Sequence, residues 1–135
     1  KTGKLKPNLP YLKVLDKQSG VYIIKSDRTG KVVYVGYSEG GLYKTIYRHF
    51  QKWTDISKNV KTRFTYGKSG YLVRIIFTTK QRAELLEKYL IVRLKPRDNE
   101  VKYEGYLTKA QGAEAVSILN DAQTIHIGNS DKMPF

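Results

Sequence analysis

The sequence GVYIIKSDRTGKVVYVG, at residues 20–36, consists of two runs of β-branched and aromatic residues on either side of a turn. The runs are residues 20–25 and 31–36, and the five residues between them include Asp27 and Gly30, which favour turns. β-branched and aromatic side chains favour strands, and a loop of this length joins antiparallel neighbours. The stretch therefore predicts a β-hairpin.

The alternation of side chains along a strand predicts which of these residues share a face. In the first strand, Tyr22 shares a face with Ile24. In the second strand, Tyr34 shares a face with Val32 and Gly36. From this pattern alone, both tyrosines are ordinary residues of a core or a sheet surface.

Beyond the hairpin, the sequence alternates between helical and strand patterns. Apolar residues recur at helical spacing over residues 42–53, which predicts a first helix of about three turns. A third strand is predicted over residues 71–78, a second helix over 80–95 and a third helix over 108–121. We therefore expect an α/β (α+β) fold, with a small three-stranded antiparallel sheet flanked by helices and an extra helix near the C-terminal end.

The helix ends and the longest loop also carry signals. Thr79 and Thr108 are expected to cap the second and third helices, and Pro96 is expected to stop the second. Residues 54–69 are polar, basic and interrupted by glycine, which predicts a long loop. Loops of this length in small domains are typically functional.

A length of 135 residues suits a single domain with one core. Composition divides this chain into three parts. Residues 1–18 carry five lysines and two prolines and are expected to form a basic arm. Residues 19–100 form the main domain. Residues 101–135 hold the third helix and an acidic tail, which we expect to pack on the same domain. Within the tail, His126 lies in the apolar alternation TIHIG and is expected to be structural.

The chain is strongly basic, with 25 Lys and Arg against 12 Asp and Glu and a formal net charge of +13. Residues 1–97 hold 22 basic and 6 acidic side chains, whereas residues 98–135 hold 3 and 6. This excess indicates a polyanion bound by the first hundred residues, the alternative being a solvated surface that keeps the protein soluble. No segment pairs a basic face with a long apolar face, so nucleic acid is favoured over a membrane as the partner.

Features that the sequence lacks exclude other classes. Without cysteine there are no disulfides, no Cys-containing zinc sites and no thiol nucleophiles. No apolar run approaches the roughly 20 residues of a membrane span, and none near residue 1 resembles a signal peptide. We expect a soluble, intracellular protein of the cytoplasm, nucleoid or nucleus. The chain opens with Lys1 rather than Met, which leaves room for a fused or associated specificity domain, and no oligomeric state is indicated.

Five short motifs follow one another from the hairpin to the end of the second helix. They are GVY at 20–22, YVG at 34–36, RHF at 48–50, LLE at 85–87, and KPR with a later Asn at 95–99. Each motif alone is weak, but the ordered set with this spacing is specific. Together they resemble the signature of the GIY-YIG nuclease family, over residues 19–100.

The resemblance implies a metal-dependent DNA endonuclease that hydrolyses phosphodiester bonds. In that family the first tyrosine is a general base or orients water beside the scissile phosphate, which gives this role to Tyr22. The second tyrosine sits in the same pocket, which places Tyr34 there, and His49 is expected to assist. A single Mg²⁺ or Mn²⁺ would be held by Glu87. Because a phenol ionises near pH 10, a base of this type requires positive charge nearby.

The helical pattern supports the carboxylate separately. At about 100° per residue, Glu87 falls at the edge of the apolar arc, between Leu94 and Ile91. Glu84 instead projects with Lys88 on the polar face. A partly buried carboxylate in a basic domain needs a partner, which is either a lysine or arginine or a hard divalent cation.

The sequence departs from the family pattern at Thr45, where family members carry an arginine one helical turn before His49. An arginine would stabilise the charge of the pentavalent phosphate through paired hydrogen bonds, which a hydroxyl does not replace. Arg48 lies about 60° around the helix from Thr45 and is a candidate substitute, the alternative being an ordinary phosphate-contacting or solvent-facing charge. Cleavage by this chain is therefore expected to be impaired.

Three functions remain at this stage. The first is the endonuclease, with Lys44, Arg48, Lys52 and Asn99 expected to contact DNA. The second is a catalytically weak or inactive nucleic-acid-binding module of the same fold, which Thr45 favours. The third is a basic RNA-binding or ribosome-associated domain in which the motifs are coincidental.

Overall fold

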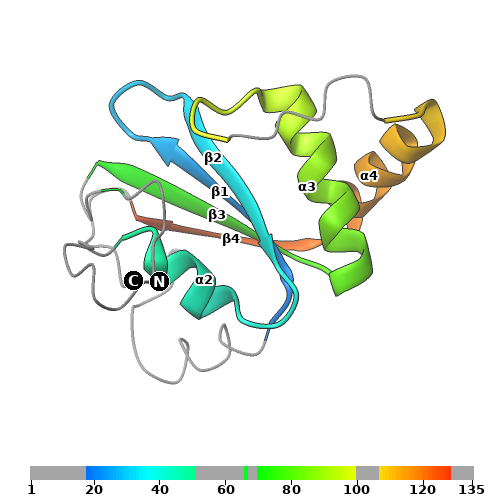
Figure 1. Cartoon of the computed structure of the whole chain (residues 1–135), viewed down its shortest axis with the longest axis horizontal. Helices are drawn as coiled ribbons and strands as arrows, with labels where there is room; N and C mark the ends of the chain where they lie inside the picture. The colour runs from blue at the N-terminus through cyan, green and yellow to red at the C-terminus, as the bar shows by residue number, and fades with distance from the viewer. Residues whose placement is uncertain (1–17, 51–65, 67–69, 100–106, 129–135) are drawn as a thin grey trace, which may run out of the picture.

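The computed structural model describes residues 18–50, 66, 70–99 and 107–128. The structure does not describe most of the basic arm. It also does not describe residues 51–53, which were expected to be helical and include Lys52. The described elements are β1 (Gly20–Ser26), β2 (Val32–Ser38), α2 (Leu42–Arg48), β3 (Tyr71–Phe77), α3 (Lys80–Leu94), α4 (Lys109–Asp121) and β4 (Gln123–Gly128). Figure 1 shows a twisted sheet with α2 on one side and α3 and α4 on the other.

The hairpin of β1 and β2 is confirmed. Its turn is closed by hydrogen bonds from the backbone N–H of Ser26 to Lys31 O (2.9 Å) and of Gly30 to Ser26 O (2.8 Å). Gly30 has φ 73°, a left-handed conformation that glycine adopts without a steric penalty. The turn residues therefore act as the sequence predicted.

The register of the hairpin brings the two motif tyrosines to one face. Tyr22 pairs with Gly36, and Ile24 pairs with Tyr34. A register shift after Ile24 then pairs Lys25 with Val32. Val32 consequently packs with the core on the other face, so the expectation that it shares a face with Tyr34 was wrong.

Within the described residues, four antiparallel strands form one sheet in the order β2-β1-β3-β4, rather than the three that were expected. The additional strand is β4, which belongs to the segment interpreted as a tail. All six of its residues pair with β3, and Ile127 is only 6% exposed. Strand β4 covers an edge of β3 that would otherwise present unpaired N–H and C=O groups.

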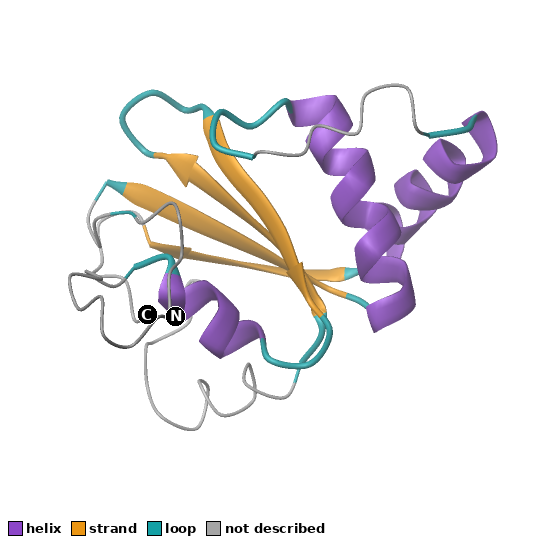
Figure 2. Ribbon diagram, viewed as in Figure 1, coloured by secondary structure: helices purple, strands orange, loops and turns teal. Residues whose placement is uncertain are grey.

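Each face of the sheet has its own core. On one face, Tyr22 and Ile24 pack with Leu42 and Ile46 of α2. On the other face, Val21 packs with buried residues of α3 and α4. Figure 2 shows these two helices on that side of the sheet. The sheet is therefore the middle of three layers.

The helices begin and end largely as predicted. Thr79 accepts a hydrogen bond from the backbone of Arg82, and Thr108 forms a reciprocal capping box with Gln111. Helix α3 stops at Leu94, before a left-handed Lys95. Helix α2 has only seven residues and ends at Arg48, about one turn earlier than expected. None of the helices in the described ranges is long and apolar enough to cross a membrane.

The place of Ile127 in the core yields a stability prediction. We expect Ile127→Ala to lower the free energy of unfolding by about 2–4 kcal/mol, because it leaves a cavity beside β3. Val116→Ala is the matched control, since Val116 is exposed on α4 and its loss should cost less than about 0.5 kcal/mol. Urea denaturation of both variants measures the difference, and equal effects would show that β4 does not contribute to the core.

Candidate active site

Three residues named from the sequence, Tyr22, Tyr34 and His49, lie together on the face covered by α2. The hydroxyl of Tyr22 lies 2.9 Å from Nε2 of His49 in a buried hydrogen bond. The ring of Tyr34 is centred 4.6 Å from that of His49 and 6.2 Å from that of Tyr22. Residues 27 positions apart are thus joined in one polar contact inside an aromatic cluster.

The contact depends on the lack of a side chain at Gly36, opposite Tyr22 in the register. A Cβ atom at Gly36 would collide with the hydroxyl and ring of Tyr22. The phenol therefore lies directly against the backbone of β2. This gives a physical reason for the glycine in the second motif.

Burial makes Tyr22 a weaker acid than a tyrosine in water. The pKa of Tyr22 is raised well above 10, first by desolvation and then by the nearby Tyr34, Glu87 and Tyr66. Arg48 opposes this shift, and its effect is the smallest of those acting on Tyr22. Tyr22 is therefore a neutral phenol, which donates its proton to His49 when the other ring nitrogen carries the imidazole hydrogen.

Tyr66 belongs to the site although no motif pointed to it. Its backbone N–H donates to the carbonyl of His49 (2.6 Å), and its ring lies against those of His49 and Phe50. Its hydroxyl donates to Asp98 Oδ2 (2.8 Å), and Asp98 also accepts from Arg97. The one available signal was the position of Tyr66 in the long loop that was expected to be functional.

Glu87 lies half-buried on α3, next to the buried Leu86. Its pKa is raised to about 7, mainly by desolvation and secondly by Glu84, while Lys88 lowers it. Its Oε1 atom is buried and has no hydrogen-bond partner within the described residues. A buried carboxylate oxygen without a donor is costly, and a cation would compensate its charge.

The surroundings of Glu87 fit a hard divalent cation. In the described part of the chain, no three His, Asp or Glu side chains gather in a cluster that could hold a metal. Glu87 would supply one carboxylate ligand to such a cation. Mg²⁺ is commonly held in this way, by one or two carboxylates together with phosphate oxygens.

Thr45 supplies a hydroxyl at the position where the resemblance led us to expect an arginine. Its Oγ1 donates to the carbonyl of Gly41 (2.9 Å) and contacts Oγ of Ser38 at 3.2 Å. Ser38 also accepts from the backbone N–H of Gly41 (2.9 Å). Thr45 thus stabilises the turn from β2 into α2 and brings no charge to the site.

The residues expected to contact DNA differ in exposure. Lys44 and Arg48 are exposed on α2, as a phosphate contact requires. Asn99 is only 7% exposed, and its amide accepts from Val35 N (2.9 Å) and donates to Val35 O (2.8 Å). The structure therefore gives Asn99 a role in holding the edge of β2, and its burial does not support the expected contact with DNA.

Comparison with models of known protein families gives a match. A family model described as the GIY-YIG catalytic domain matches residues 18–107, which is 90 of the 135 residues. No curated protein matches the chain. The match contains both strand motifs, His49, Glu87 and Asn99.

The raised pKa of Glu87 predicts that the free energy of unfolding of the metal-free protein depends on pH. Between pH 4.5 and 7 the unfolded chain loses this proton before the folded protein does, so the stability contributed by Glu87 falls as pH rises. We therefore expect Glu87→Gln to be more stable than the parent by about 1–3 kcal/mol at pH 8, with no difference near pH 4.

Urea denaturation in EDTA across this pH range measures the effect, and Glu84→Gln should give a smaller one. If the difference in stability between the parent and Glu87→Gln is the same at pH 4 and at pH 8, the carboxylate of Glu87 is solvated.

Proposed function

Because the chain belongs to the GIY-YIG family, whose domains are generally endonucleases, we propose that it is a divalent-metal-dependent endonuclease that hydrolyses phosphodiester bonds in DNA. The observation that carries the proposal is the buried Tyr22–His49 hydrogen bond, formed within electrostatic reach of Glu87, whose Oε1 atom has no hydrogen-bond partner among the described residues. The basic character of the chain and the exposed Lys44 and Arg48 support a polyanionic substrate.

The geometry favours a proton relay over a free phenolate. Deprotonation of Tyr22 on its own is opposed by the causes that raise its pKa. If the phenol oxygen takes a proton from water while the phenol proton passes to Nε2 of His49, which lies 2.9 Å from that oxygen, no buried negative charge accumulates on Tyr22. In this proposal Tyr22 positions the nucleophile and His49 stores the proton.

The other residues position this pair and the substrate. Tyr34 is more exposed than Tyr22 or His49, so we assign it to the side from which the phosphate approaches. Tyr66 holds the backbone of His49 and is itself anchored to Asp98. When bound at Glu87, Mg²⁺ or Mn²⁺ supplies polarisation of the scissile phosphate and stabilisation of the leaving oxyanion.

A second candidate function is a nucleic-acid-binding module that cleaves poorly. It is favoured by the engagement of Thr45 with Ser38 and Gly41, which puts no cation at the position of the family arginine. Arg48 reaches Tyr22 electrostatically, which supports it as a partial substitute in the same site. The two candidate functions differ in the rate of DNA cleavage and share the same binding partner.

Nicking of supercoiled plasmid tests the endonuclease. In Mg²⁺ we expect the parent chain to produce nicked DNA, and Glu87→Gln to lose this activity about 100-fold or more while still binding DNA. Glu84→Gln is the matched control on the exposed side of α3 and should retain activity. Nicking that persists in EDTA, or equal losses in the two variants, would contradict the proposed role of Glu87.

Substitution of Thr45 separates the two candidate functions. We expect Thr45→Arg to raise the single-turnover cleavage rate about 10²-fold to 10³-fold, because a guanidinium stabilises charge that develops on the phosphate. Thr45→Lys should raise it less, since an ammonium lacks the paired geometry. Thermal melting of each variant checks that loss of the contact with Ser38 leaves the fold intact. Rapid cleavage by the parent chain that is lost in Arg48→Ala would instead assign the arginine role to Arg48.

A further inference from the structure

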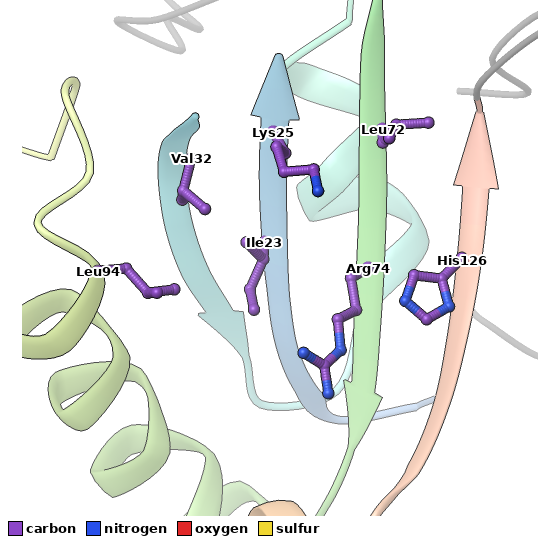
Figure 3. A pocket seen from close by; sticks show the side chains of 7 residues that line it. All are labelled: Ile23, Lys25, Val32, Leu72, Arg74, Leu94 and His126. Carbon is purple, nitrogen blue, oxygen red and sulfur yellow. The ribbon is translucent and has the colours of Figure 1, made fainter. Parts of the chain in front are cut away.

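A cavity opens beside the end of α3, on the sheet face opposite to Tyr22. Two rows of side chains on this face come from neighbouring pairs of β1 and β3: Ile23 pairs with Arg74, and Lys25 pairs with Leu72. A cavity of about 260 Å³ lies over these rows (Figure 3). Its residues come from all four described strands and from α3, so the fold holds it in place. It shares no residue with the candidate active site.

Most of the cavity wall is apolar. Ile23 and Leu72 form part of it, and Val32 enters from β2 because of the register shift in the hairpin. Leu94, the last residue of α3, stands at its margin and is 40% exposed. An exposed leucine beside an apolar concavity favours a ligand with an apolar body.

The polar residues of the cavity are all basic in type. They are Lys25 on β1, Arg74 on β3 and His126 on β4, and Arg74 and His126 are directly paired across the strands. No Asp or Glu of the described residues lines the cavity. An anionic ligand therefore meets positive charge from Lys25 and Arg74 on two neighbouring strands.

Arg74 gives an independent sign of a missing partner. Its Nε atom is buried and makes no hydrogen bond to any described residue. Buried donors are nearly always satisfied, and one that is not lowers stability unless a ligand or water completes it. The rest of the side chain is not fully buried, so a ligand in the cavity has access to the guanidinium.

We propose that this cavity binds a small organic anion that carries one carboxylate or phosphate group on an apolar body. The guanidinium of Arg74 holds the anionic group, Lys25 adds positive charge to another part of the cavity, and the body of the ligand covers Ile23, Leu72 and Leu94. The backbone of duplex DNA is a poor fit, because its hydrophilic sugars and phosphates would make little apolar contact with this wall. The site is separate from the proposed endonuclease function and does not depend on it.

The test uses the fluorescent probe 8-anilinonaphthalene-1-sulfonate, an aromatic body with one anionic group, on the full chain. We expect saturable binding that octanoate or octyl phosphate displaces, and the stronger competitor distinguishes a carboxylate from a phosphate ligand. Octanol, which has the same chain without the charge, should compete at least tenfold less well. Arg74→Met should weaken probe binding about tenfold or more, through loss of a charge-assisted hydrogen bond.

Matched variants make the result decisive. Arg82→Met removes the same charge from an exposed position of α3 outside the cavity and should change binding less than twofold. Lys25→Met removes an exposed cavity cation, so it tests the site even if Arg74→Met fails to fold, and should weaken binding at least threefold. Equal effects of Arg82→Met and the cavity variants, competition by octanol equal to that by octanoate, or displacement of the probe by duplex DNA would each overturn the proposal. Plasmid nicking is not a readout here, so failure of this site and failure of the proposed function are distinguishable.

Discussion

The close approach of Tyr22 to the backbone of Gly36 is the constraint on which the site depends. Strand β1 lies between β2 and β3 and is hydrogen-bonded to both, so the backbone of Tyr22 has little freedom to move. The phenol therefore needs the space that Gly36 leaves empty. Only then does its hydroxyl meet His49, which the end of α2 holds on the same face. A sheet register, a glycine and a short helix thus combine to make one hydrogen bond.

Burial governs the chemistry of this site more than the net charge of the chain does. The chain carries a formal charge of +13, yet desolvation is the largest cause of the raised pKa values of both Tyr22 and Glu87. The exposed cations of α2 and the buried acids consequently have different tasks. In the proposed function, the exposed Lys44 and Arg48 would attract a polyanion from a distance, whereas the buried groups would respond to charge that arrives beside them.

The features that could be predicted from the sequence are those set by local pattern. The hairpin, the caps at Thr79 and Thr108 and the position of Glu87 on α3 follow from alternation, capping chemistry and helical periodicity. The part that could not be predicted depends on pairing between distant segments. Strand β4 shows only the short alternation TIHIG, and its place in the sheet is fixed by its pairing with β3. The bond between Tyr66 and Asp98 joins residues 32 positions apart. The burial of Asn99 against Val35 likewise depends on contact between residues 64 positions apart, which its motif does not indicate.

The attachment of residues 98 and 99 to β2 has a consequence for how molecules of this protein meet one another. β2 is an outer strand of the sheet, and such strands offer their backbone to any extended chain nearby. Here the N–H of Asp98 occupies Val33 O, and the amide of Asn99 occupies both N–H and C=O of Val35. A single side chain thus imitates the peptide group of a missing fifth strand. It blocks edge-to-edge association at the centre of β2, and so protects a concentrated solution of the protein from polymerising through this edge.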